Sequence, residues 1–178
     1  MKKLSLVLFS FSVLALGTSC IAQQNRAPSP ACKMEQKVGL TDITVEYSRP
    51  SVKDRTVFAD DGLVPFGKIW RTGANAATKI TFSDDVKIEG KDLAKGSYAI
   101  LTVPTKMEWA VNFYPYEATG WNTYTSKDPK LSVKVKPHSL GETQIESFFI
   151  AVGDLRDYSA TLNFVWENTR VPVKLEVK

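Results

Sequence analysis

Hydrophobic and polar residues alternate along most of this chain, which is the pattern of β-strands with one buried face. Two segments show it most clearly, each with three apolar side chains on one face: Ile43, Val45 and Tyr47 in TDITVEYS (41–48), and Leu131, Val133 and Val135 in KLSVKVKP (130–137). No segment has the period of a helix of three turns. The pattern therefore predicts an all-β protein.

Turn residues between the alternating segments predict which strands pair. Asp84 and Asp85 separate residues 78–83 from residues 86–90, a spacing typical of a hairpin. Residues around Lys106 predict a second hairpin, between SYAILTVP (97–104) and EWAVNFYP (108–115). The last two alternating segments, SATLNFVWEN (159–168) and RVPVKLEVK (170–178), form the final predicted pair.

Two segments carry information about position within a sheet. Residues 144–153, QIESFFIAVG, are more apolar than the other segments and predict a central strand covered on both faces. Pro172 lacks a backbone donor, so the last strand is expected at an edge, or with an irregular start. About nine or ten strands without crossover helices predict an antiparallel β-sandwich, of jelly-roll or immunoglobulin-like type.

The N-terminus has the composition of an export signal. Lys2 and Lys3 precede an apolar run from Leu4 to Leu16 that is too short to cross a membrane. Cleavage after Ala22 and acylation of Cys20 are both compatible with the residues that follow. We expect a signal peptide (1–22), an N-terminal arm (23–31) and one β-sandwich domain (32–178). The protein is then periplasmic, attached to the outer membrane or extracellular in a Gram-negative bacterium.

Composition narrows the chemistry. Removal of the signal peptide takes away two lysines and no acid, so the net charge falls from +4 to +2, too little to indicate nucleic-acid binding. The only histidine, His138, rules out a site with several histidine ligands. Cys32 is the only thiol after Cys20, so no disulfide forms within the domain. We expect no cofactor, no metal and no transmembrane span.

One aperiodic stretch, VPFGKIWRTGANAATKI (64–80), stands out between the strands. Turn chemistry explains Gly73, which can adopt positive φ, and Asn75, which can bond to the backbone. It does not explain Trp70 and Arg71. Two interpretations remain open for Arg71 and for two other arginines of the chain, Arg49 and Arg55. Arginines at strand ends bind an anion, or they pair with nearby carboxylates and hold loops in place. The candidate ligand-binding residues are Arg49, Arg55, Trp70, Arg71, Asn75, Trp121 and Tyr124. The last two come from an aromatic loop that either lines a ligand pocket or covers the end of the sandwich.

The strings YSRPSVKDRTVF (47–58), WRTGAN (70–75) and LNFVWENTRVPVKLEV (162–177) together resemble the bacterial domain of unknown function 2911. That family consists of secreted proteins of Bacteroidetes-type bacteria, and the resemblance extends from about Ser29 to Val177. It implies no particular activity. The residues that match its pattern are Tyr47, Arg49, Pro50, Arg55, Pro65, Trp70, Arg71, Gly73, Asn75, Gly96, Tyr98, Pro104 and Trp109. The chain departs from the family at Lys130, where an arginine often follows the acid that Asp128 represents.

Three hypotheses of function follow. The first is a non-catalytic module that binds a small molecule, a glycan or another envelope component. The second is a hydrolase of envelope polysaccharide or peptide that uses carboxylates and a bound water, and the third is a purely structural envelope protein. Arginines without carboxylate partners in an open cleft favour the first. Arginines paired with acids around a buried Trp70 favour the third.

Overall fold

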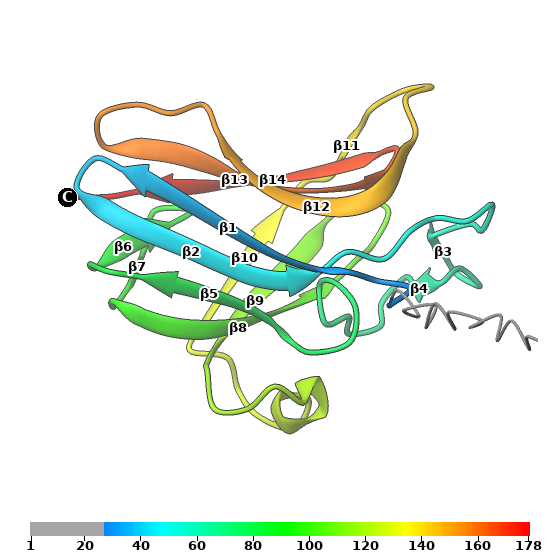
Figure 1. The fold of residues 1–178 in the computed structure, drawn as a ribbon, viewed down its shortest axis with the longest axis horizontal. Helices are drawn as coiled ribbons and strands as arrows, with labels where there is room; N and C mark the ends of the chain where they lie inside the picture. Colours follow the sequence, from blue (N-terminus) through cyan, green and yellow to red (C-terminus); the bar gives the residue numbers. More distant parts are fainter. Residues whose placement is uncertain (1–26) are drawn as a thin grey trace, which may run out of the picture.

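The computed structural model describes residues 27–178, so the predicted signal peptide and Cys20 lie outside the described residues. Two antiparallel sheets form the layers of a sandwich (Figure 1). The strands and the one short 3-10 helix are β1 (Ala31–Val38), β2 (Thr41–Ser48), β3 (Phe58–Ala59), β4 (Val64–Pro65), β5 (Thr78–Phe82), β6 (Val86–Ile88), β7 (Lys91–Leu93), β8 (Gly96–Val103), β9 (Trp109–Pro115), η1 (Trp121–Tyr124), β10 (Leu131–Val135), β11 (His138–Ser139), β12 (Ile145–Gly153), β13 (Ser159–Glu167) and β14 (Thr169–Glu176).

The order of strands brings distant segments together. The first sheet runs β1-β2-β5-β8-β9-β10, and the second runs β12-β13-β14-β6-β7, with β11 beside β14. The very short strands β3 and β4 form a separate parallel pair. The all-β class and the antiparallel sheets are confirmed, although the strands outnumber the nine or ten that we expected. Among residues 27–178, no helix has the length and hydrophobicity of a membrane span.

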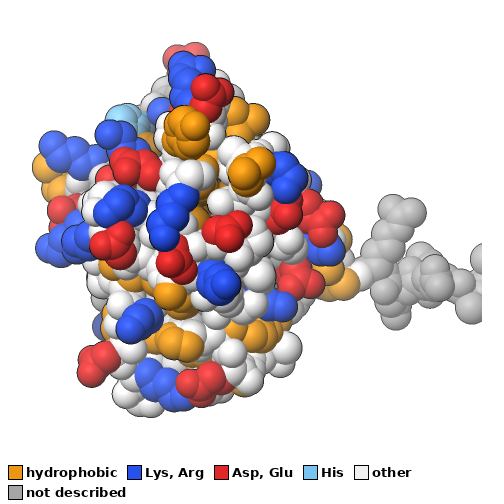
Figure 2. Space-filling view, turned by 90° about the vertical axis from the view of Figure 1, so that its left-hand side faces the viewer, with side chains coloured by type: hydrophobic (Ala, Val, Ile, Leu, Met, Phe, Trp, Pro, Cys, Tyr) orange, Lys and Arg blue, Asp and Glu red, His pale blue; other side chains and the backbone are white. Residues whose placement is uncertain are grey.

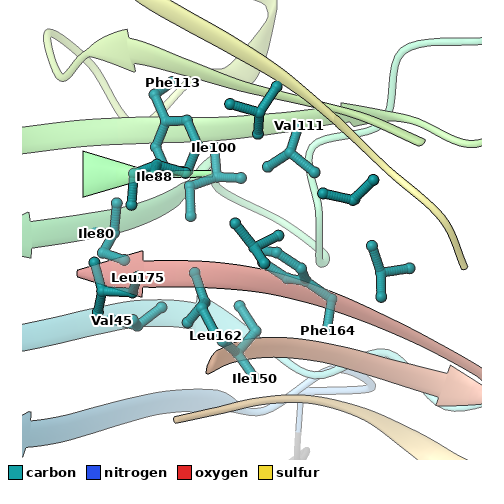
Figure 3. Packing of buried hydrophobic residues seen from close by; sticks show 14 of the residues in the cluster. Val45, Ile80, Ile88, Ile100, Val111, Phe113, Ile150, Leu162, Phe164 and Leu175 are labelled. Carbon is teal, nitrogen blue, oxygen red and sulfur yellow. The ribbon is translucent and has the colours of Figure 1, made fainter. Parts of the chain in front are cut away.

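The core lies between the two sheets. Ile80 and Ile100 from the first sheet face Leu162 and Leu175 from the second, as Figure 3 shows. The apolar faces predicted from alternation are buried in every segment that we singled out, including residues 41–48 and 130–137. The β8–β9 hairpin and the β13–β14 pair are also confirmed.

The predicted hairpin at Asp84 and Asp85 is wrong. β5 pairs with β2 and β8 in the first sheet, whereas β6 pairs with β14 and β7 in the second. The two aspartates therefore lie where the chain crosses from one layer to the other. Alternation identified which side chains of β5 and β6 are buried, but a turn between layers and a hairpin turn use the same polar residues.

The positions predicted for the last strand and for residues 144–153 are also wrong. β12 is an edge strand, and β14 lies inside the second sheet. Pro172 fits there because β11 pairs only with residues 169–170 of β14 and β6 only with residues 175–176. The N–H of Lys174 bonds to Glu89 on the β6 side, and the two-residue period turns the nitrogen of Pro172 to that same side. The N–H that Pro172 lacks would therefore point to the part of β14 that neither β11 nor β6 pairs with.

The sequence pattern missed β1. From Ala31 to Lys37 its side chains alternate between exposed and half-buried, and only Val38 at its end is buried, because β1 is an edge strand that packs most of its inner face weakly against the core. Cys32 lies in this strand, paired in register with Tyr47, and is a half-buried free thiol. A strand with so few large apolar residues resembles a polar arm in sequence.

One open side of the sandwich is closed by a seam between residues 47–53 and residues 146–150. The β12–β13 register shifts between Ile145 and Phe149, and there the backbone of β12 turns to this other segment. The N–H of Phe148 donates to the carbonyl of Pro50 (2.9 Å), and the N–H of Val52 donates to that of Glu146 (2.8 Å). The seam fastens the end of β2 to the opposite sheet.

The Tyr47 hydroxyl completes the seam from inside the core. It accepts a hydrogen bond from the backbone N–H of Ile150 (3.0 Å) and donates to the carbonyl of the same residue (3.5 Å). Burial raises the pKa of Tyr47 to about 12, so the hydroxyl keeps its proton at neutral pH. The YSRP string of the sequence is therefore part of the connection between the sheets.

We expect Tyr47→Phe to lower the free energy of unfolding by about 1–3 kcal/mol, because it leaves the buried N–H of Ile150 without an acceptor. Urea denaturation followed by tryptophan fluorescence measures the change. Tyr158→Phe is the matched control, since Tyr158 is 67% exposed. Equal stabilities of the two variants would show that the hydroxyl adds nothing to the seam.

Candidate functional site

A pocket of about 420 Å³ opens at the end of the sandwich that carries β3 and β4, on the right in Figure 1. Five of the seven residues selected from the sequence line it: Arg55, Trp70, Arg71, Asn75 and Trp121. Lys53 and Lys68 also line it, as do Pro28 and Ser29 from the segment before β1. None of the residues that line the pocket is Asp or Glu. The structure thus collects four cationic side chains around one cavity.

The loop between Trp70 and Thr78 forms one wall of this pocket, and backbone contacts define its shape. Trp70 exchanges two backbone hydrogen bonds with Thr102 of β8 (2.7 and 2.8 Å). The hydroxyl of Thr78 donates to the carbonyl of Thr72 (2.6 Å), which closes the loop. Gly73 has φ 154° and Asn75 φ 58°. The aperiodic sequence reflects a loop held by hydrogen bonds and not a disrupted strand.

Trp70 forms the floor of the pocket as part of an aromatic cluster. Its ring stacks on Trp166 (5.7 Å between ring centroids, 19° between planes), and its Nε1 donates to the carbonyl of Gly73 (3.1 Å). The other members of the cluster meet the Trp70 ring edge to face: Phe58, Trp109 and Phe148. Trp70 is only 8% exposed, so its ring is mainly a core residue with one edge at the pocket.

Arg71 points away from the core and is held without an acid. Its guanidinium carbon lies 5.7 Å from the centre of the Trp121 ring, a cation–π contact. Its Nε is buried and has no hydrogen-bond partner among residues 27–178. A buried charged donor without an acceptor is unfavourable and calls for an explanation, such as a bound group that the described residues do not supply.

Tyr124 positions Trp121 from behind. The Tyr124 hydroxyl accepts from the N–H groups of Glu117 (3.0 Å) and Ala118 (2.9 Å) and donates to the carbonyl of Ala118 (2.6 Å). Its ring is fully buried against Tyr114 on the outer face of the first sheet. Tyr124 therefore lies outside the pocket and orders the loop that carries Trp121. The aromatic loop covers a sheet face and not the open end of the sandwich.

The segment after β2 holds Arg55 in a defined orientation. Its Nε donates to the carbonyl of Val52 (2.9 Å) and its Nη2 to that of Ser51 (2.7 Å). Lys53 begins a turn with positive φ at Lys53 and Asp54 (50° and 56°), and its N–H donates to the carboxylate of Glu146 (3.1 Å). Lys53 and Lys68 were missed from the sequence because isolated lysines carry no signal until a fold gathers them.

The segment before β1 supplies the remaining wall. The side-chain amide of Asn75 donates to the carbonyl of Ser29 (3.1 Å), and the N–H of Arg49 donates to that of Pro30 (2.9 Å). Asn75 was expected to bond to the backbone of its own turn, whereas its side-chain amide bonds to the backbone of the distant segment before β1. Arg49 lies outside the pocket, where its Nε donates to the carbonyl of Phe148 across the seam (2.9 Å). Arg49 therefore stabilises the fold and does not line the pocket.

The arginines have no carboxylate partners. All ion pairs among the described residues are formed by lysines, and none joins an acid to Arg49, Arg55 or Arg71. The arginines instead contact backbone carbonyls or an aromatic ring. Within residues 27–178, no cluster of His, Cys, Asp and Glu has the arrangement of a metal site.

Residues 29–175 match the protein family described as "Protein of unknown function (DUF2911)". The chain belongs to this family. Comparisons with curated proteins and with solved structures found no match. The matched range includes both the seam and every strand that borders the pocket, and only Pro28 of the pocket lies before it.

We expect Gly73→Ala, in the pocket wall, to destabilise the protein more than Gly67→Ala does. A Cβ at Gly73 would lie 3.0 Å from both the carbonyl oxygen of Ser48 and the hydroxyl of Thr78. At Gly67, which also has positive φ (72°), a Cβ would meet no atom within 4 Å. Gly67→Ala should therefore cost only the left-handed backbone strain of about 1–2 kcal/mol, and Gly73→Ala should exceed it.

Chemical denaturation of both variants provides the comparison. A Gly73→Ala protein as stable as Gly67→Ala would mean that the loop can move away from Ser48 and Thr78, contrary to the close packing described above.

Proposed function

We propose that this protein is a non-catalytic binding protein and that its pocket takes a small anionic molecule. The observation that carries the proposal is the charge of the lining: Lys53, Arg55, Lys68 and Arg71 border one cavity that no acid lines. Cations that share a pocket repel each other, and a bound anion relieves that repulsion. The face shown in Figure 2 differs from the pocket, because Lys, Arg, Asp and Glu side chains intermingle there.

The arrangement of the arginines supports binding over a purely structural role. A structural arginine is usually balanced by a carboxylate, because an unpaired charge removed from water is costly. Arg49 and Trp70 do stabilise the fold, as the third hypothesis supposed. Arg71 differs from them, since its Nε has no partner among the described residues and its guanidinium lies on the Trp121 ring at the pocket. A bound anion would balance the charge of this guanidinium, which no carboxylate among the described residues does.

The size and walls of the pocket are compatible with a metabolite or a sugar. Its volume of about 420 Å³ falls in the range typical of small-molecule sites. Apolar side chains, among them Leu63, Ile69 and Trp121, alternate with the cations. A glycosidase-type hydrolase would need two facing carboxylates. The pocket lining contains none, and it therefore offers the hydrolase hypothesis no support.

We expect anionic sugars and organic acids to raise the melting temperature of the protein in a thermal-shift screen, whereas neutral sugars do not. At a ligand concentration of 100 times Kd the increase should be roughly 5–10 °C. Arg71→Ala should weaken binding by about tenfold or more, because it removes a charged hydrogen-bond donor.

The matched control is Arg156→Ala, which removes the same charge from an exposed loop at the other end of β12. Binding that Arg71→Ala and Arg156→Ala weaken equally would reflect net charge alone. A hit that neither variant changes would rule out this pocket as the site.

We further propose that the protein is exported, on the pattern of residues 1–22, and acts in the periplasm, at the outer membrane or outside the cell. Intact mass of the protein from the native host tests this. Cleavage after Ala22 predicts the mass of residues 23–178, and acylation predicts a chain that begins at Cys20 with added lipid. An intact N-terminus that retains Met1 would contradict export.

A further inference from the structure

We infer that the ligand of the pocket carries its negative charge on a compact, doubly charged group, as in a phosphate monoester. This inference rests on the proposed anion binding and narrows it to one chemical class. A carboxylate brings one negative charge to four cations, whereas a phosphate monoester brings about 1.5 to 2 and three acceptor oxygens. The charge of a phosphate monoester therefore matches the four cations of the lining better than the charge of a carboxylate does.

Arg55 is oriented for such a group before any ligand arrives. The carbonyls of Ser51 and Val52 already accept from Nη2 and Nε. These two bonds occupy one edge of the planar guanidinium and leave Nη1 free to donate. Because the side chain is already ordered, little conformational entropy is lost when an oxygen binds to the remaining donors.

Arg71 adds a second guanidinium of fixed position. The Trp121 ring packs against the buried cluster that contains Tyr124, and its cation–π contact supports the guanidinium without neutralising its charge. Two arginine guanidiniums and the lysine side chains of Lys53 and Lys68 are residue types that proteins use to bind phosphate.

The pocket is larger than a phosphate, so the ligand has a further part. Apolar and hydroxyl-bearing residues also line the cavity, among them Pro28, Ser29, Leu63 and Ile69. A phosphate on a sugar-sized body matches both kinds of lining residue. The same phosphate chemistry is found in soluble sugar phosphates and in the headgroup of phosphatidic acid.

Isothermal titration of the full mature chain with three matched probes tests the inference: glucose 6-phosphate, glucuronate and glucose. They share a ring and differ at one position in carrying a phosphate, a carboxylate or a hydroxyl. We expect glucose 6-phosphate to bind about tenfold or more tightly than glucuronate, and glucose not to bind. Lys68→Gln, an exposed substitution that leaves the core intact, should reduce this preference several-fold, whereas Arg156→Ala should not.

A second arm identifies the source of the phosphate. Phosphatidylcholine vesicles that contain phosphatidic acid, a monoester, are compared with vesicles that contain phosphatidylglycerol, a diester with a single charge. If the protein sediments only with the vesicles that contain phosphatidic acid, and the Lys68→Gln variant does not, the monoester belongs to a lipid headgroup.

The outcomes separate the two proposals. Equal affinity for glucuronate and glucose 6-phosphate would leave the anion site standing and overturn the preference for a doubly charged group. Failure of both sugar acids and of both kinds of vesicle to bind would overturn the anion site as well.

Discussion

The packing of the Trp70 indole is the interaction on which the candidate site depends. Its ring stacks on Trp166 of the second sheet, while its backbone pairs with Thr102 of the first sheet. One residue therefore ties both layers together at the end of the sandwich. Its Nε1 bond to the carbonyl of Gly73 then sets the path of the next residues. Because the indole is anchored in the core, the side chain that follows it, Arg71, is directed into the pocket. The burial of one aromatic ring thus determines where a charge is presented.

The seam likewise fixes the position of the segment after β2. Tyr47, Arg49 and Pro50 fasten that segment to β12 through backbone groups, so the loop leaves the sandwich from a defined point. Arg49 and Arg55 look alike in sequence, but their side chains donate to different parts of the fold. Arg49 bridges two sheets, whereas Arg55 uses only one edge of its guanidinium for the fold. The site is built on elements whose positions are already fixed by buried contacts, and this support lets four cationic side chains line one cavity that no acid lines.

The part of the fold that was predictable is the part that depends on neighbours in sequence. Alternation identified the buried faces of β2, β5, β9 and β10, because a strand with one buried face must alternate whatever its partner is. It failed for β1, whose inner face is only half buried before Val38, and for the turn at Asp84 and Asp85, which crosses between layers. Pro172 misled for a related reason. A proline is excluded from a continuous ladder, and nothing local reveals that β14 has a gap at that point.

The sequence by itself determined the all-β class, the membership in the family, the buried faces of most strands and the unusual character of the Trp70–Arg71 loop. The family membership follows from the match over residues 29–175. The other properties follow from local periodicity and from residue types that turns and cores require. Only the tertiary structure decided which strands are neighbours and that Arg49 and Tyr124 stabilise the fold. It also decided that four cationic side chains line one cavity that no acid lines: Lys53, Arg55, Lys68 and Arg71. The reason is physical: the charge of a pocket is the sum over residues far apart in the chain, and packing alone brings them together.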